Sequence, residues 1–389
     1  MYFCLKIDLM NYLASNFTLG IIGGGQLGKM LCQVTSRLSI KTNILDPSDD
    51  SPCRNLCSSF TKGDLMDFNS VYDFGKQCDL VTYEIEHINV DALKKLENEG
   101  IKVCPNSSTL RIIQDKNLQK EFLIKNNIPT ASFSYYSSLS NLNVNNLKFP
   151  CVWKKTKFGY DGYGVKVLKT EEDLKDLPEG EFIIEKMIPF KKELATTIAR
   201  NESGEIEIFP IVEMMFNEIS NQVEFVICPA QINEDVSEKA KQIALNVSNS
   251  FKQVGLLAVE MFLTENEEIL VNEVAPRPHN SAHYSIENCI NSQFDQHINS
   301  ILNLPLGCSK SNFYAIMANL VGSNGYSGNV IYEGIEEAMK YNNVKIHIYG
   351  KKKTKPNRKM GHITVVDNDL KEGLKKAKNI KELIKIKAV

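Results

Sequence analysis

The sequence predicts a protein of two or three domains that joins a parallel α/β unit to antiparallel α+β units. Its 389 residues are too many for one small core. Strand and helix patterns alternate as far as residue 128, which is typical of a parallel sheet covered by helices. Between residues 181 and 230, strand patterns follow one another through turns, which indicates an antiparallel sheet.

The composition is that of an ordinary globular protein. There are 45 basic and 47 acidic residues, a net charge of −2, so no global charge argues for a nucleic-acid or membrane partner. The ten cysteines lack zinc-type spacing and are typical of reduced thiols in a cytoplasmic enzyme. Residues 1–17 lack the apolar core of a signal peptide, so we expect a loosely ordered extension.

A glycine-rich turn follows the first predicted strand, at 18–22. Residues 23–28 read GGGQLG, a helix with an apolar stripe comes next, and a strand at 41–46 ends in Asp46. Glycines and an acid in this order are typical of a dinucleotide site, as in an NAD-dependent oxidoreductase. The same turn also opens many α/β domains that bind no dinucleotide, with the glycines serving the turn and helix packing.

The α/β pattern continues with strands at 80–86 and 101–105 and a helix at 90–99 between them. A helix over 109–125 follows, with Ser107 or Ser108 as its N-cap. Glu84 and Glu86 lie where a strand meets a loop, at the sheet edge where open α/β folds bind ligands. Spacing alone gives a solvated strand end equal weight.

A glycine loop opens the middle region. The polar stretch 132–146 is expected to be a connection, and a strand at 150–155 leads into the loop 156–164. Backbone N–H groups and the preceding lysines suit an anion such as phosphate. The loop lacks the GK[ST] and helix of a Walker loop, and a plain hairpin turn is the alternative.

Two acidic residues lie within apolar strands. Glu260 is inside LLAVEMF, Glu273 is inside ILVNEVA, and TENEE forms the turn between them. Buried strand faces normally exclude charge, whereas paired carboxylates suit a hard cation such as Mg²⁺. The run PRPHNS at 276–281 follows at once. Either glutamate alone would be an ordinary solvent-facing residue, but the whole constellation predicts a site.

The remaining patterns complete the chain. Strands at 181–188, 192–200, 205–213 and 223–230 precede a helix at 237–254, and a helix over 285–307 follows the hairpin. Residues 311–389 contain strands at 313–322, 344–350 and 361–367 and a lysine-rich terminal helix. The basic cluster 351–359 suits either a phosphate contact or a solvated loop, and spacing alone favours the loop.

The order of these motifs resembles the N5-carboxyaminoimidazole ribonucleotide synthetase family of the ATP-grasp superfamily. The motifs are GGGQLGKML, YEIEH, IIQDKNLQKEFL, VWKKTKFGYDGYG, IIEK, LAVEMF, VNEVAPRPHNSAHYSIE and KPNRKMGHI. The resemblance implies an ATP-grasp fold with a Rossmann-like N-terminal (pre-ATP-grasp) domain and a small C-terminal domain. The expected boundaries are 1–17 (extension), 18–115 (N-terminal domain), 116–310 (ATP-grasp domain, flap near 156–164) and 311–389 (C-terminal domain).

The resemblance implies an ATP-dependent carbon–nitrogen ligase. It would carboxylate 5-aminoimidazole ribonucleotide with bicarbonate, through carboxyphosphate, in purine biosynthesis. It would use Mg²⁺ (or Mn²⁺) and ATP but no NAD, as a cytoplasmic homodimer. The alternatives are a related ATP-grasp ligase or transformylase acting on another amine, a non-catalytic ATP-grasp binding module, and the NAD-dependent oxidoreductase.

The resemblance also implies roles for individual residues. The expected catalytic residues are Glu260, Glu273, Arg277 and His279, with Glu260 and Glu273 as metal ligands. The expected ATP-binding residues are Lys116, Lys154, Gly159, Tyr160, Asp161, Gly162, Gly164, Glu185, Lys186, Glu193, Asn272 and Glu273. The expected substrate-binding residues are Glu84, Tyr160, Asp161, Arg277, His279, Asn280, Ser281, Lys351 and Arg358. The base for the amine stays open among His279, His283 and Glu84.

Three positions depart from the family pattern. Lys116 stands where the family usually has Arg, which keeps the charge but loses the bidentate fork. Tyr163 replaces a basic residue of the glycine loop, and Ala282 replaces a glycine after the HNS run. These changes leave in place the groups that the chemistry requires.

Overall fold

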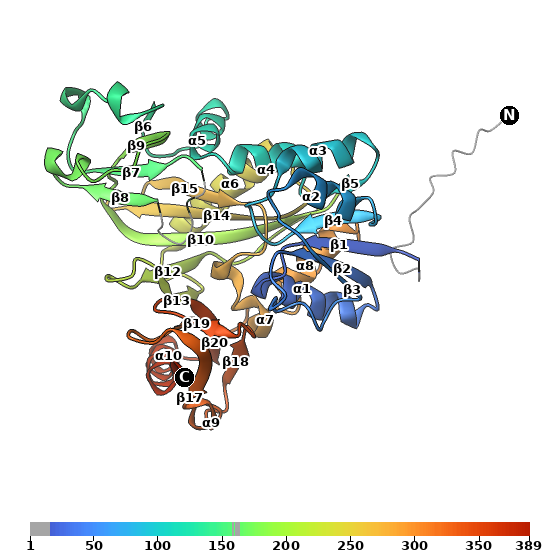
Figure 1. The fold of residues 1–389 in the computed structure, drawn as a ribbon. Coiled ribbons are helices and arrows are strands. Elements are labelled where there is room, and N and C mark those ends of the chain that lie inside the picture. Colours follow the sequence, from blue (N-terminus) through green and yellow to red (C-terminus); the bar gives the residue numbers. More distant parts are fainter. Residues whose placement is uncertain (1–15, 158, 160–163) are drawn as a thin grey trace.

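A computed structural model describes residues 16–157, 159 and 164–389 of the chain (Figure 1). The N-terminal domain is a parallel sheet, as predicted, in the order β3-β2-β1-β4-β5. Its strands are β1 (Thr18–Ile22), β2 (Lys41–Asp46), β3 (Ser59–Lys62), β4 (Leu80–Tyr83) and β5 (Lys102–Val103). Its helices are α1 (Gln26–Arg37), α2 (Phe68–Gly75), α3 (Val90–Asn98) and α4 (Ser107–Ile113). The elements β3 and α2 were not predicted; β3 has no buried residue to give an apolar pattern.

The single helix predicted over 109–125 is wrong, because α4 ends at Ile113 and α5 (Lys116–Lys125) begins separately. The N-cap of α4 is Asn106 rather than Ser107 or Ser108; its side chain accepts from the backbone N–H of the third residue of the helix. The carboxylate of Asp115 accepts from two backbone N–H groups of α5, at 2.9 and 3.3 Å. Lys116 is therefore the first residue of a new helix.

A four-stranded antiparallel sheet follows, in the order β6-β9-β7-β8. Its strands are β6 (Phe133–Tyr136), β7 (Cys151–Lys155), β8 (Val165–Leu168) and β9 (Phe182–Lys186), with short 3₁₀ helices η1 (Leu139–Asn141), η2 (Val144–Asn146) and η3 (Glu171–Leu174). The connection expected at 132–146 is wrong in part, because its aromatic-rich residues 133–136 pair with β9 as an edge strand.

The largest sheet is antiparallel and has the order β15-β14-β10-β12-β13-β16-β20-β18, with β11 paired to β10. Its strands are β10 (Phe190–Arg200), β11 (Ile206–Ile208), β12 (Val212–Phe216), β13 (Val223–Cys228), β14 (Gly255–Thr264), β15 (Ile269–Ala275), β16 (Tyr314–Val321), β18 (Val344–Ile348) and β20 (Lys359–Asp367). The helix α6 (Glu234–Phe251) covers β10, β14 and β15 and packs against Leu257, Val259 and Met261. These alternate residues of β14 face α6, so Glu260 faces the other side of the sheet.

The prediction of one helix over 285–307 is also wrong, because this segment contains two helices, α7 (Ser285–Asn288) and α8 (Gln293–Ile301). Ser292 and Asp295 form a capping box that begins α8 anew. The helix α8 contacts α1 on one side and β10 and β14 on the other. It thereby joins the N-terminal domain to the central sheet (Figure 1).

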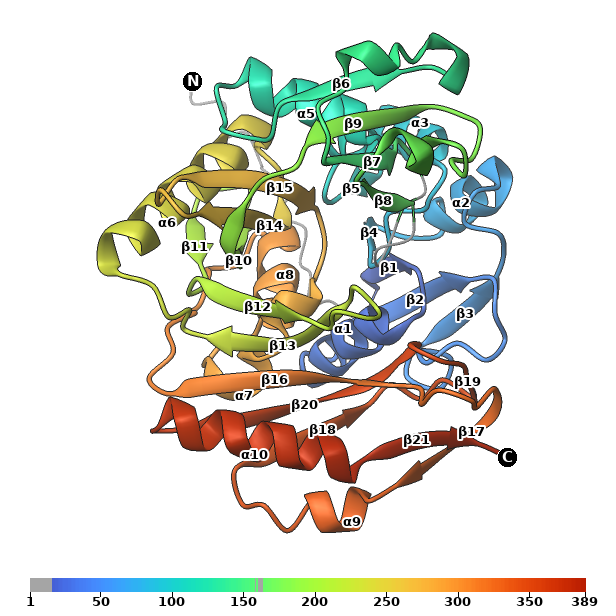
Figure 2. The same cartoon turned by 90° about the vertical axis from the view of Figure 1, so that its left-hand side faces the viewer.

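The C-terminal domain extends the central sheet rather than standing apart from it (Figure 2). Four residues of β13, from Phe225 to Cys228, pair with β16. The remaining elements are η4 (Asn280–Ala282), β17 (Gly328–Glu333), α9 (Ile335–Ala338), β19 (Lys353–Thr354), α10 (Leu370–Leu383) and β21 (Lys385–Ala388). The Nζ of Lys29 donates to the carbonyl of Ile348 at 2.8 Å, so the first and last domains also touch.

Two further features concern the whole described chain. Within its residues, no helix is both long enough and apolar enough to cross a bilayer. The described cysteines are free thiols, and most of them are buried. The buried cysteines therefore act here as small apolar residues.

The cap of α5 provides a test of the fold. Asp115→Ala removes the acceptor for two helix N–H groups, so we expect the melting temperature to fall by about 1–2 °C, the equivalent of about 1 kcal/mol in a chain of this length. Scanning calorimetry measures the shift, and Asn69→Ala, an exposed truncation in α2, should leave the melting temperature nearly unchanged. An unchanged value for Asp115→Ala would show that α5 does not depend on its cap.

Candidate active site

The two predicted carboxylates lie opposite each other. The sheet register pairs Glu260 of β14 with Glu273 of β15, and a β-bulge next to this pair leaves Asn272 as an extra residue. The flanking Val271 and Val274 belong to the core against α6. Asn272 and Glu273 therefore both turn away from that core, toward the side of the sheet that Glu260 faces.

The two carboxyls differ in protonation. Burial raises the pKa of Glu260 to about 8, and the charges of Glu273 and Glu193 add to the rise. Partial burial acts in the same direction on Glu273, but Lys116 and Lys154 outweigh it and lower its pKa to about 2. Near neutral pH the negative charge of the pair therefore resides chiefly on Glu273.

This carboxylate pair fits a divalent cation, because a cation beside both groups would allow both to ionise. Among the described residues, no group of three or more His, Cys, Asp or Glu is arranged to hold a metal. The protein would thus supply part of the oxygen ligands, as is usual for Mg²⁺ shared with phosphates.

The break before α5 places Lys116 over this pair. Its backbone N–H donates to the carbonyl of Thr156 at 2.8 Å, and its Nζ donates to Glu273 Oε2 at 2.8 Å. Burial alone would lower the pKa of Lys116, but Glu273 raises it above its usual value. Lys116 is therefore a charged group, fixed at the carboxylate pair.

Lys154 of β7 reaches the same place from the four-stranded sheet. Its Nζ donates to Asn272 Oδ1 at 3.0 Å and lies 2.8 Å from Glu185 Oε2. Glu185 is 2% exposed, and its second oxygen lies 3.1 Å from Lys120 Nζ. Lys120 was not predicted; its signal was a second lysine one helical turn after Lys116.

The other predicted nucleotide residues surround this cluster. Glu193 of β10 lies on the strand next to β14, and burial raises its pKa to about 7 against the charge of Lys154. Lys186 is exposed at the end of β9, and Gly159 is half-buried. Gly164 has a φ of +80°, and its carbonyl accepts from the backbone of Lys155 at 2.9 Å. Outside the described residues lie Tyr160, Asp161 and Gly162.

The loop after β15 begins on the same side of the sheet. The Nε of Arg277 lies 3.1 Å from Glu86 Oε1, which ties the loop to the end of the parallel sheet. The Nε2 of His279 lies 3.3 Å from Glu260 Oε1, and its Nδ1 lies 2.9 Å from Ser281 Oγ. The loop therefore touches the carboxylate pair directly.

Two residues that the sequence did not indicate hold this loop. Asn319 of β16 exchanges two amide hydrogen bonds with Asn280, at 2.9 and 2.7 Å. Gln293 of α8 accepts from the backbone N–H of His279 and donates to its carbonyl, at 2.8 and 2.9 Å. His283, which also contacts Gln293, is 1% exposed, and burial lowers its pKa well below the usual range. His283 is thus a neutral, packed residue.

The glycine turn at 23–28 is occupied by the chain's own carboxylates. Gly25 donates its N–H to Glu84 Oε1 at 2.9 Å, and Gly24 donates to Asp46 Oδ2 at 2.8 Å. Burial raises the pKa of Glu84 to about 7, although the Gly25 N–H opposes the rise. A dinucleotide phosphate and ribose would need these same groups. The geometry therefore argues against the dinucleotide interpretation.

The basic cluster at 351–359 forms a turn that its own side chains support. Lys351 Nζ donates to the carbonyl of Lys359 at 2.8 Å, and the Arg358 guanidinium donates to the carbonyl of Lys353 at 2.6 Å. Lys359 belongs to the predicted cluster but was given no role of its own. It is the residue of this cluster whose charge opposes the rise in the pKa of Glu260.

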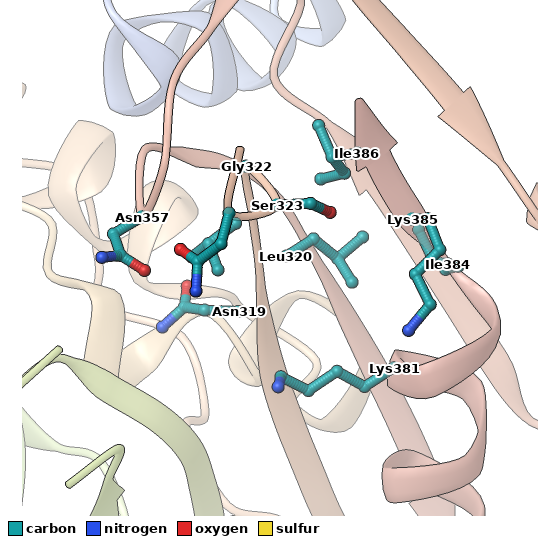
Figure 3. Close-up of a pocket in the computed structure, with 11 residues that line it drawn as sticks. Asn319, Leu320, Gly322, Ser323, Asn357, Lys381, Ile384, Lys385 and Ile386 are labelled. Atoms are coloured by element: carbon teal, nitrogen blue, oxygen red, sulfur yellow. The ribbon is translucent and has the colours of Figure 1, made fainter. Parts of the chain in front are cut away.

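A cavity of about 290 Å³ lies beside the end of β16 and the end of α10 (Figure 3). Asn319, Asn357 and Lys381 contribute to its lining. Among the described residues, those that line this cavity include neither Glu260 nor Glu273. The cavity is therefore separate from the carboxylate pair, although Asn319 connects it to the loop through Asn280.

Three family models match the chain in succession. Residues 17–114 match the ribonucleotide synthetase preATP-grasp domain, and residues 121–294 match the ATP-grasp domain. Residues 315–376 match the phosphoribosylaminoimidazole carboxylase C-terminal domain. The fold, the lysines and the carboxylate pair thus define an ATP-grasp protein.

Comparison with individual proteins shows which family of ATP-grasp proteins the chain belongs to. N5-carboxyaminoimidazole ribonucleotide synthase of Bacillus subtilis is 36% identical over 93% of this chain and 94% of its own length. The chain therefore belongs to the N5-carboxyaminoimidazole ribonucleotide synthase family. The crystal structure of the Thermotoga maritima synthetase is 44% identical, with a TM-score of 0.88 over 96% of this chain and 100% of that one.

A further solved structure and the relatives' lengths complete the comparison. The Aspergillus clavatus synthase, in complex with ADP and 5-aminoimidazole ribonucleotide, is 31% identical, with a TM-score of 0.85 over 95% of this chain and 98% of that one. Other relatives are phosphoribosylaminoimidazole carboxylases, and the chain spans 64% of the length of those from Vigna aconitifolia and Saccharomyces cerevisiae.

The glycine turn gives a ligand test. NADH should leave the melting temperature unchanged, because Glu84 and Asp46 already occupy the N–H groups of the turn. Mg²⁺ with a non-hydrolysable ATP analogue should raise it by several degrees, since a ligand that binds the native state stabilises it. Differential scanning fluorimetry compares the two, and stabilisation by NADH alone would reinstate the dinucleotide interpretation.

The carboxylate pair gives a mutational test. Glu273→Gln keeps the shape but removes the charge, and we expect a loss of about 10²–10³-fold in Mg²⁺-dependent ATP turnover. Glu265→Gln, in the exposed turn of the same hairpin, is the matched control and should retain wild-type turnover. If Glu273→Gln kept nearly wild-type turnover, the assignment of Glu273 as a metal ligand would be wrong.

Proposed function

We propose that this chain uses ATP and bicarbonate to carboxylate the 5-amino group of 5-aminoimidazole ribonucleotide, giving the N5-carboxyamino product, ADP and phosphate. One observation carries the proposal beyond family membership. Glu260 pairs across the sheet with Glu273, which Lys116 contacts, and it also lies 3.3 Å from His279 of the loop. A single carboxylate thus borders both the cationic cluster and the loop.

The cationic cluster is proposed as the ATP site. Lys116 and Lys154 would neutralise phosphates, with Gly159 and Gly164 beside them on the glycine loop. Glu193 would accept from the ribose, and the backbone at Glu185 and Lys186 would line the adenine. Tyr160, Asp161 and Gly162 stay predictions for the same loop. The support is that lysines from α5 and β7 converge at Asn272 and Glu273.

We propose Mg²⁺ as the cation, with Mn²⁺ as the alternative. Glu260 and Glu273 would hold it together with phosphate oxygens, and the adjacent Asn272 would stay with Lys154. When bound, the ion supplies charge neutralisation at the transferring phosphoryl group.

The loop after β15 is proposed as the ribonucleotide site. Arg277, His279, Asn280 and Ser281 would face the substrate, and Glu84 would border the same site. Lys351 and Arg358 would bind its 5′-phosphate. The support is that the loop touches both the carboxylate pair and Glu86 of the first domain. In the Aspergillus clavatus relative, ADP and 5-aminoimidazole ribonucleotide are bound together.

The chemistry requires alignment more than a strong nucleophile. A bicarbonate oxygen attacks the γ-phosphorus and ADP leaves, giving carboxyphosphate. The amine then attacks the carboxyl carbon, phosphate leaves, and the amine loses a proton. His279, held by Gln293 and next to Glu260, is positioned beside the amine in this scheme. Water must be kept out, because carboxyphosphate hydrolyses readily.

A homodimer and a cytoplasmic location stay predictions from the family resemblance, and we propose both. Size-exclusion chromatography with light scattering measures the first. Fractionation of the cells that make the protein measures the second.

The proposed reaction makes a specific kinetic prediction. ADP release should require both 5-aminoimidazole ribonucleotide and bicarbonate, because phosphoryl transfer needs the bicarbonate oxygen and turnover needs the amine. A coupled ADP assay in CO₂-free buffer, with bicarbonate restored as the variable, measures this. If the ribonucleotide stimulated ADP release equally with and without bicarbonate, the proposal would be contradicted. Another carboxylate substrate would then be favoured.

A further inference from the structure

Lys120 is a buried lysine whose side chain does not reach the surface of the site. It lies on α5, one turn after Lys116, and is 3% exposed. Its Nζ donates to Thr130 Oγ1 at 2.7 Å and lies 3.1 Å from Glu185 Oε1. Thr130 in turn donates to the carbonyl of Val271 at 2.7 Å. These contacts fix Lys120 between α5, β9 and β15 and leave it no access to solvent.

Glu185 is shared between two lysines. One oxygen faces Lys120, and the other faces Lys154 at 2.8 Å. Burial opposes ionisation of Glu185, but the two lysine charges outweigh it and lower its pKa. Burying a lysine is costly, and burial lowers the pKa of Lys120 to about 8 although Glu185 opposes this. The positive charge of Lys154 alone would be enough to balance the negative charge of Glu185.

The second lysine changes the charge that remains for a ligand. The three ion pairs join Lys116, Lys120 and Lys154 to Glu185 and Glu273, so these five groups carry three positive and two negative charges, a net charge of +1. Glu193, near Lys154, adds the same partial negative charge whether or not Lys120 is present. Without Lys120, two charges of each sign would cancel. Lys154 would then form a closed pair with Glu185, while Lys116 already pairs with Glu273.

We propose that Lys120 is a positioning residue for the nucleotide site: by holding one oxygen of Glu185, it leaves Lys154 an uncompensated cation directed at Asn272 and the ATP phosphates. The inference adds a residue to the proposed nucleotide site. It rests on one part of the proposed function, namely that ATP binds at Lys116 and Lys154. It does not depend on which amine accepts the carboxyl group. Lys120 itself touches no substrate.

The charge argument predicts rescue by a second substitution. In Lys120→Met the cluster becomes neutral, and we expect the Kd of a non-hydrolysable ATP analogue with Mg²⁺ to rise about tenfold. In Lys120→Met with Glu185→Gln, the buried negative charge is also removed and the net charge returns to +1. This double variant should bind within about threefold of wild type, a coupling that contacting residues show. A role in packing alone predicts that the double variant binds no better than the single one.

Isothermal titration calorimetry measures these affinities without any acceptor substrate. Lys125→Met, the same substitution on the exposed face of α5, is the matched control and should bind as wild type does. Lys120→Gln, which retains an amide donor for Thr130, repeats the comparison should Lys120→Met not fold. Wild-type affinity in both Lys120 variants, or no recovery in the double variant, would overturn the inference. Failure of the wild-type protein to bind the analogue would instead contradict the proposed function.

Discussion

The pairing of Glu260 with Glu273 across β14 and β15 is the constraint on which the site depends. Two carboxylates side by side on a sheet repel each other, and here the repulsion is relieved unequally. Glu273 is ionised beside Lys116, whereas burial and its neighbour keep Glu260 largely protonated near neutral pH. The bulge at Asn272 is part of the same arrangement, because it turns two consecutive residues of β15 away from the core of α6. The remaining site residues are arranged around this unequal pair.

Elements from separate parts of the chain converge there. Lys116 comes from the start of α5, Lys154 from the four-stranded sheet, and His279 from the loop that α8 holds through Gln293. None of these elements is adjacent to the others in the sequence. The site therefore exists only when the separate sheets are packed together, and hydrogen bonds such as that from Thr130 to the carbonyl of Val271 join the segments around it.

The sequence predicted the carboxylate hairpin and the main strands of the first and central sheets, because apolar periodicity and turn residues are local signals. It did not predict short elements such as β3 and α2, and the strand predicted at 205–213 is divided between β11 and β12. It failed where a polar side chain ended one helix and began another, at Asp115 and Ser292. It missed Lys120, Gln293 and Asn319, whose roles depend on partners far along the chain. The bulge that makes Asn272 an extra residue was likewise invisible, because register is a property of two strands and not of one.

The continuity of the central sheet from β13 into β16 has a mechanical consequence. A hinge between these strands would have to break the paired positions from Phe225–Ala318 to Cys228–Ala315. The basic turn at 351–359 connects β18 to β20, so the central sheet that contains the carboxylate hairpin also carries the two ends of this turn (Figure 2). Strand spacing therefore fixes the distance between the hairpin and the ends of the turn, and under the proposed function that distance would have to match the length of the ribonucleotide.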